Sequence, residues 1–140
     1  MKPAFAIVAA VALVMALPGE SLARRGVPIV NYDNVPVVRA DRAVLTDARL
    51  REGIVRGVQR TGWIVLEDTP GRIVANLTIR GGKHSMTVEI RYGSGSFSID
   101  YRDSHNLNYG TGPSGPVIHP AYNKDVKRLL DTINAGLQGI

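Results

Sequence analysis

Two histidines and an aspartate fall within one polar stretch of the chain, residues 101–123, which reads YRDSHNLNYGTGPSGPVIHPAYN. Asp103, His105 and His119 are of the types that bind metals or transfer protons. A metal site usually needs three or four convergent ligands, and an Asp-x-His pair followed by thirteen residues and a second histidine matches no defined motif. We therefore expect these side chains to tie the last strand to the last helix by hydrogen bonds. The alternative is a metal-dependent or acid-base enzyme that uses them.

Other catalytic chemistry finds no support in the sequence. The chain has no cysteine, and none of its serines lies in a Gly-x-Ser-x-Gly turn. The segment GTGPSG, residues 110–115, lacks the Gly-Lys-Ser/Thr ending of a phosphate loop, and its proline has no N–H to donate. We expect no catalytic residue, no metal and no cofactor, and so no enzyme. If the polar stretch binds a ligand, the residues that we expect to do so are Asp103, Ser104, His105, Asn106, Asn108, Tyr109, His119 and Tyr122.

The first 23 residues have the layout of a secretory signal peptide. Lys2 precedes an apolar run, residues 4–17, and small residues occupy the positions before a cleavage site after Ala23. The run is shorter than the roughly 20 residues that span a bilayer. We expect export to the periplasm, cleavage after Ala23, a single domain over 24–140, and no transmembrane segment after cleavage. Without cysteine, the chain can have neither a lipid anchor at the cleavage site nor a disulfide.

Two segments show the periodicity of helices. In the first, residues 46–62, Thr46 is placed to cap the start and Gly62 to end the helix, while Gly53 and Gly57, one turn apart, would let another segment approach closely. The second, residues 123–138, would begin at an Asn123 cap. Apolar residues recur on one side of each helix, and they are Leu50, Ile54 and Val58 in the first and Val126, Leu129, Leu130, Ile133 and Leu137 in the second.

The period changes to two between residues 63 and 102. Short strands over 63–68, 72–80, 84–92 and 96–102 are separated by turns that contain glycine, as in an antiparallel meander. An earlier stretch, residues 24–43, contains Pro28 and Pro36 and should be an edge strand or an extended arm, because proline cannot donate a hydrogen bond to a neighbouring strand. The sequence thus predicts a two-layer α+β domain of order β-α-β-β-β-β-α, with an antiparallel meander sheet and both helices on one of its faces.

Polar residues alternate with apolar ones along the meander and predict a wet sheet face. Arg91 and Arg102 share this face with Glu89 and Asp100, so cross-strand ion pairs are expected. Nucleic-acid-binding sheets place aromatic side chains among the basic ones, a pattern that is missing here, and we expect no nucleic acid as partner. We expect Trp63 in the core or at its boundary, and His84, beside a turn, to be exposed.

The order of several short motifs resembles a family of small, uncharacterised exported proteins of Gram-negative bacteria, periplasmic proteins and lipoproteins among them. The segments that carry the resemblance are VPIVNYDNVPV, GWIVLEDTPGRIVANLTIRG, HSMTVEIRYGSGSFSIDYRDSHNLNY and VIHPAYNKDVKRLL. The chain departs from the pattern by the insert GTGPSGP, residues 110–116, and by Asp125, where an aromatic residue is frequent. The resemblance implies an exported α+β domain and no known activity.

These features lead to one functional expectation. With a formal net charge of +5, the chain should favour anionic partners. We expect an exported, non-enzymatic domain that binds or scaffolds a component of the cell envelope. The positive charge favours an anionic component. Its binding surface is expected at the wet sheet face or in the stretch 103–123.

Overall fold

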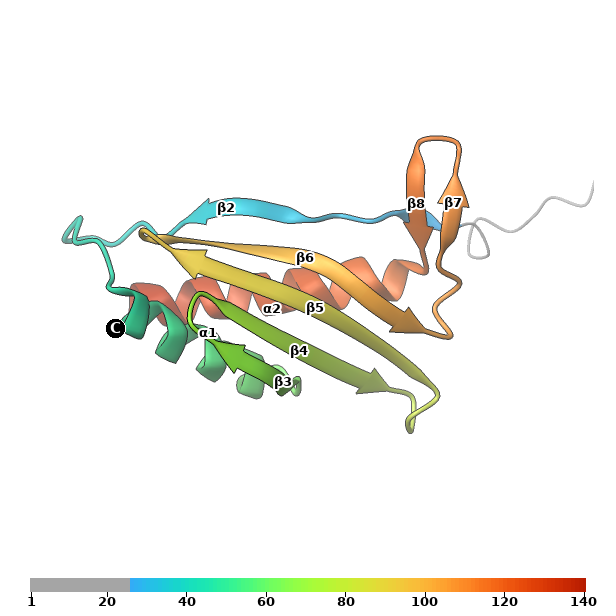
Figure 1. Cartoon of the computed structure of the whole chain (residues 1–140), viewed down its shortest axis with the longest axis horizontal. Coiled ribbons are helices and arrows are strands. Elements are labelled where there is room, and N and C mark those ends of the chain that lie inside the picture. The colour runs from blue at the N-terminus through green and yellow to red at the C-terminus, as the bar shows by residue number, and fades with distance from the viewer. Residues whose placement is uncertain (1–25) are drawn as a thin grey trace, which may run out of the picture.

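The computed structural model describes residues 26–140, which form an α+β fold with two antiparallel sheets and two helices (Figure 1). The predicted signal peptide lies outside the described residues. Neither described helix has the length and apolarity needed to cross a membrane. The elements are β1 (Val27–Pro28), β2 (Tyr32–Pro36), α1 (Asp47–Arg60), β3 (Ile64–Thr69), β4 (Arg72–Ile79), β5 (His84–Gly93), β6 (Ser96–His105), β7 (Gly110–Gly112), β8 (Gly115–Ile118) and α2 (Pro120–Gln138).

The larger sheet has five strands in the order β2-β6-β5-β4-β3. Strands β3 to β6 form the predicted meander, in which each strand pairs antiparallel with the next. The strand β2 pairs with β6 and forms one edge, where Pro36 does not interrupt the sheet because an edge strand needs fewer donors. The predictions of an antiparallel α+β fold and of an edge position for the first strand are confirmed.

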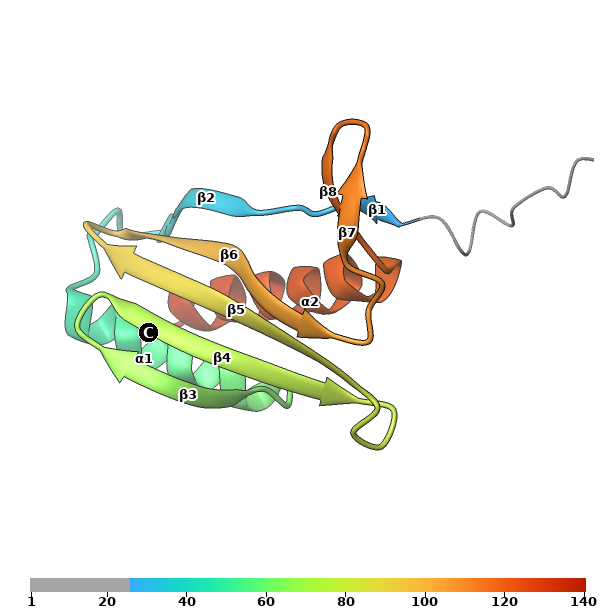
Figure 2. The same ribbon diagram turned by 45° about the vertical axis from the view of Figure 1, so that its right-hand side comes forward.

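The core lies between the larger sheet and the helices. Figures 1 and 2 show both helices on the same side of this sheet. Every second residue of the central strands faces this core, and Trp63 is buried there as expected. The buried residues from the strands are Ile73 and Ala75 in β4, Met86, Val88 and Ile90 in β5, and Phe97 and Ile99 in β6, and they belong to one cluster with the apolar stripes of α1 and α2.

Helix α1 begins and ends where its sequence signals lie. The Thr46 hydroxyl accepts a hydrogen bond from the Arg49 N–H, and Asp47 follows in the positively polarised first turn. After Arg60 the chain leaves the helix through Gly62, whose φ of +83° is in the left-handed region that glycine enters without steric cost. Both boundaries were therefore readable from single residues.

The two helices approach closely at two glycines of α1. A Cβ atom at Gly57 would lie 2.7 Å from the Ile133 Cγ1 atom and 3.1 Å from the Ile133 Cα atom, and one at Gly53 would lie 2.3 Å from the Leu137 Cδ2 atom. These distances leave no room for a side chain on α1, so Ile133 and Leu137 of α2 pack directly on its backbone. The close approach that Gly53 and Gly57 suggested is made by α2.

The substitution Gly57→Ala should lower the free energy of unfolding by about 1–3 kcal/mol because the new methyl group meets the backbone of Ile133. The gain in helix propensity, about 1 kcal/mol, offsets only part of this cost. Gly136→Ala is the matched control, since a Cβ atom there meets nothing within 4 Å, and it should leave stability unchanged or higher. Urea unfolding of both variants measures the difference; equal effects would show that α2 does not rest on Gly57.

A second, three-stranded sheet of order β1-β8-β7 was not predicted. The insert at residues 110–116 forms most of the hairpin β7–β8, which pairs through β8 with β1. Glycine and proline dominate these strands, and both are depleted in sheets, so no strand signal was present. In Figures 1 and 2 the hairpin projects away from the larger sheet.

The predicted N-cap of the last helix is wrong by four residues. Helix α2 begins at Pro120, and His119, not Asn123, is its N-cap. Proline at the first helical position is favoured, because its fixed φ suits the helix and its missing N–H would have no partner there. The Asn123 side chain instead donates to the Pro28 carbonyl at 2.8 Å and accepts from the Val30 N–H at 3.1 Å. It thereby holds the segment that leads from β1 to β2 against α2.

Candidate functional site

The eight residues predicted to bind a ligand lie on three separate parts of the fold. Asp103, Ser104 and His105 belong to the end of β6, which is longer than predicted. Asn106, Asn108 and Tyr109 follow in the link to β7, and His119 and Tyr122 lie at the start of α2. The stretch 103–123 is therefore a strand end, a short link, a hairpin and a helix start.

A bulge in β6 decides where the Asp103 side chain lies. Thr87 pairs with Asp103 and Val88 pairs with Tyr101, so Arg102 is an extra residue without a partner in β5. Simple alternation would place Asp103 on the core side with Tyr101. Because of the bulge, Asp103 instead shares the outer face of the sheet with Thr87. Nothing in the sequence marked this position, since the bulged residue is not a glycine.

The three residues of the alternative enzyme hypothesis do not form a metal site. Within residues 26–140 no group of three or more His, Cys, Asp or Glu side chains could hold a metal ion. His119 also has its Nδ1 atom engaged, since it accepts the Ala121 N–H at 3.1 Å as the helix cap. A neutral ring with a bare Nδ1 carries its proton on Nε2, so His119 has no lone pair left for a metal while it caps the helix.

Hydrogen bonds join the end of β6 to its neighbours, as expected for a fastening role. The Leu107 carbonyl accepts the His119 N–H at 2.8 Å, which ties the link after β6 to the start of α2. The Asn106 amide donates to the Lys83 carbonyl at 3.1 Å, and the Asn106 carbonyl lies 2.6 Å from the His84 Nδ1 atom. The expectation that His84 would be exposed is wrong: it is half-buried and bound to this link.

Three tyrosines, one of them from this link, pack together. The rings of Tyr101 and Tyr109 stack in parallel with centroids 4.9 Å apart, and those of Tyr101 and Tyr122 meet edge to face at 5.5 Å. The Tyr101 hydroxyl lies 2.9 Å from the Ser104 hydroxyl. Tyr122 is 0% exposed, and its hydroxyl has no hydrogen-bond partner among the described residues. Burial, together with the nearby Tyr101, raises the pKa of Tyr122 far above the usual tyrosine range.

We expect Tyr122→Phe to keep or raise the free energy of unfolding, by up to about 1–3 kcal/mol, because it removes a buried hydroxyl without a partner and keeps the ring. Tyr101→Phe is the matched control; it should lower stability by about 1 kcal/mol, because it breaks the contact with Ser104. Chemical unfolding of the two variants provides the test. A clear loss of stability in Tyr122→Phe would show that this hydroxyl is hydrogen-bonded in solution.

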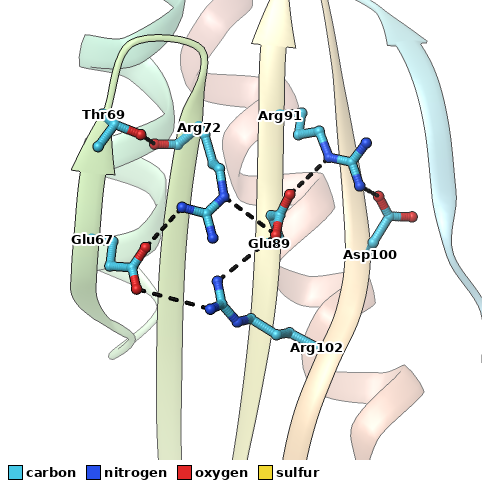
Figure 3. A network of polar contacts seen from close by, with 7 residues as sticks. All are labelled: Glu67, Thr69, Arg72, Glu89, Arg91, Asp100 and Arg102. Carbon is cyan, nitrogen blue, oxygen red and sulfur yellow. Dashed lines mark hydrogen bonds and ion pairs between the residues drawn. The ribbon is translucent and has the colours of Figure 1, made fainter.

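The outer face of the larger sheet carries an ion-pair network centred on Glu89 (Figure 3). The Glu89 carboxylate lies 2.8 Å from the Arg91 Nε atom, 3.3 Å from the Arg72 Nε atom and 3.8 Å from the Arg102 Nη1 atom. Glu67 also pairs with Arg72, at 2.7 Å, and with Arg102, at 3.9 Å. The predicted cross-strand pairs are therefore present, and they use the three arginines of strands β4 to β6.

The network covers an apolar residue on the outer face. Val74 of β4 is directly opposite Glu67 on one neighbouring strand and Glu89 on the other, and it is only 2% exposed. Burial works against the ionised form of Glu89, but hydrogen bonds from Arg91 and Arg72 outweigh it and hold the pKa of Glu89 below its ordinary value of 4.5. The ionised carboxylate therefore stabilises the fold.

The substitution Glu89→Gln should lower the free energy of unfolding at pH 7 by about 1–3 kcal/mol, because three guanidinium groups lose their shared carboxylate. The folded-state pKa of Glu89 is depressed, so its contribution is complete above about pH 4.5 and is lost as the pH falls through the lower folded value. The difference in the free energy of unfolding between the wild-type protein and Glu89→Gln should therefore disappear at acid pH. Urea unfolding over a pH series measures it.

Asp131→Asn is the control for this prediction, since Asp131 pairs with Lys127 on an exposed helix surface. Exposed pairs contribute about 0–1 kcal/mol, so we expect a small effect. If the stability difference between the wild-type protein and Glu89→Gln stayed constant down to low pH, the lost stability would not come from the carboxylate charge.

Charge is divided unequally between the two sides of the larger sheet. Strands β3 to β6 carry three basic and five acidic residues. The two helices carry seven basic and four acidic residues. The predicted wet face is therefore not the basic surface of this domain. The basic surface lies on the helices.

An open groove of about 570 Å³ runs along the outer side of α2 and includes the end of α1. We call it the basic groove. Arg60, Lys124 and Arg128 have no carboxylate partner within 4.0 Å among residues 26–140, whereas Lys127 pairs with Asp131. The groove is lined by Arg60, Lys124, Lys127, Arg128, Asp131, Thr132, Ala135 and Gly136. Three of these residues, Lys124, Lys127 and Arg128, are basic and recur at helical spacing on α2, a pattern that is visible in the sequence but matches no catalytic motif.

Comparison with known proteins assigns the chain to no family. No protein-family model matches the chain, and a search of curated proteins found no significant match.

Proposed function

We propose that this chain is an exported, non-enzymatic domain that binds a linear anionic polymer of the cell envelope in the basic groove. The single observation that carries the proposal is a difference in ion pairing between the outer face of the larger sheet and the basic groove. Arginines of the sheet face are neutralised by Glu67, Glu89 and Asp100, whereas Arg60, Lys124 and Arg128 of the groove have no such partner among the described residues.

The shape of the groove favours a chain-like partner. From Lys124 to Gly136 the lining follows α2 for about 18 Å, at about 1.5 Å per residue, so several charged units of a polymer could lie along it. Cations spaced at three and four residues all face the same side of a helix. Small side chains at Ala135 and Gly136 keep the far end of the groove open.

A lipid bilayer fits this surface less well than a polymer. Peripheral helices that bind membranes insert large apolar side chains beside their basic ones. In the part of the chain that the structure describes, the exposed large apolar residues all lie outside α1 and α2. They are Val30, Val38, Val44, Ile64, Leu66 and Tyr109. Binding at the groove therefore depends on charge and hydrogen bonds alone.

Dextran sulfate, with unsulfated dextran as the matched neutral polymer, tests the proposal. We expect binding to dextran sulfate only, weakening steeply with added salt because the contacts are exposed charges. Arg128→Glu should weaken binding roughly tenfold at low salt, since it replaces an attraction by a repulsion. Fluorescence anisotropy of the labelled polymer measures the affinity.

Lys83→Glu is the matched charge reversal, because Lys83 lies in the turn between β4 and β5 and does not line the groove. It should change the affinity far less than Arg128→Glu. Equal losses in the two variants would show that net charge, and not the groove, governs binding. Stronger binding to anionic vesicles than to dextran sulfate would replace the polymer by a membrane surface.

A further inference from the structure

A small pocket, separate from the basic groove, lies where the turn after β4, the link after β6 and the start of α2 meet. Its volume is about 130 Å³, which corresponds to about four water molecules at about 30 Å³ each. Ile79 and Leu107 provide apolar walls, and Arg80, His84, Asn108 and His119 provide polar ones. Of the lining residues, Asn106, Asn108 and His119 were expected to bind a ligand, whereas Arg80 and His84 were not.

The two histidines present opposite hydrogen-bonding atoms. The His84 Nδ1 atom lies 2.6 Å from the Asn106 carbonyl, which can only accept, so Nδ1 carries the proton and Nε2 of the neutral ring is an acceptor. The His119 Nδ1 atom accepts the Ala121 N–H, so Nε2 of that neutral ring is a donor. Main-chain groups thus fix both tautomers and leave one acceptor and one donor at the pocket.

The charge around the pocket favours an anion. No carboxylate is among the lining residues, and Arg80 has no carboxylate partner within 4.0 Å among residues 26–140. The positive end of the α2 dipole lies at Ala121, which also lines the pocket. Arg80 has a φ of +52°, a left-handed conformation that costs a non-glycine residue energy.

We infer that this pocket binds a small hydroxycarboxylate. The carboxylate accepts hydrogen bonds from the Arg80 guanidinium and from the His119 Nε2–H, and the hydroxyl donates to the His84 Nε2 atom. The short hydrocarbon part lies against Ile79 and Leu107. Each polar group of such a ligand then meets a partner of the opposite kind, which is the condition for burying it without loss.

Three related compounds test this assignment: lactate, propionate, which lacks the hydroxyl, and lactamide, which lacks the charge. Titration of the ¹⁵N-labelled protein at pH 7 should move the amide signals of Arg80, His84 and Ala121 with lactate. Propionate and lactamide should each bind roughly tenfold more weakly, because each loses one hydrogen-bonding or charged contact. No shift of these signals with lactate, or equal affinities for all three compounds, would overturn the inference.

Two variants distinguish an effect on ligand binding from an effect on the stability of the fold. Arg80→Gly removes the guanidinium and relieves the left-handed backbone, so it should keep or raise the melting temperature while weakening lactate binding roughly tenfold. His119→Asn keeps a good helix cap but removes the Nε2–H donor, with a similar loss of affinity. Arg42→Gly is the matched control, because Arg42 also has a left-handed backbone (φ of +57°) but does not line the pocket, and it should leave lactate affinity unchanged. Unchanged lactate affinity in Arg80→Gly would also overturn the inference.

Discussion

The contact between α1 and α2 is the constraint on which the rest of this fold depends. Gly53 and Gly57 bring the two helix axes close enough for Ile133 and Leu137 to rest on the backbone of α1. Only then can both helices bury their apolar stripes in one cluster with the central strands. The same contact leaves one long side of α2 in solvent, and the basic groove lies there. Packing on one side of the helix thus determines which charges remain available on the other.

Much of this architecture could be predicted because single residues carry strong local information. Thr46 and Gly62 mark the ends of α1, and alternation marks strands β3 to β6. The hairpin β7–β8 escaped prediction because its glycines and prolines have no strand propensity and its stability comes from pairing with β1. The position of Asp103 could not be predicted, because a bulge at Arg102 shifts the alternation of the strand. The bulge results from pairing with β5, and no residue type in the sequence indicates it.

The candidate sites show the same division between local and distant information. Residue types pointed to the stretch 103–123, and three of the residues predicted there, Asn106, Asn108 and His119, do line a pocket. Arg80 and His84 join them only through the pairing of distant strands and the His84 contact with Asn106. The ion pairs of Arg91 and Arg102, by contrast, could be predicted, because simple alternation along the strands already placed Glu89 and Asp100 on the same face.

The pairing of β1 with β8 has a consequence for the order of folding. Val27 pairs with Ile118, and Tyr32 of β2 pairs with Ile99, so the first strands find their partners only in the second half of the described chain. A ribosome releases the N-terminal end first, and at that stage neither strand has anything to pair with. Such distant pairings slow folding. The nascent chain therefore remains incompletely folded until most of it has been made, so its edge strands are exposed to other chains for most of its synthesis.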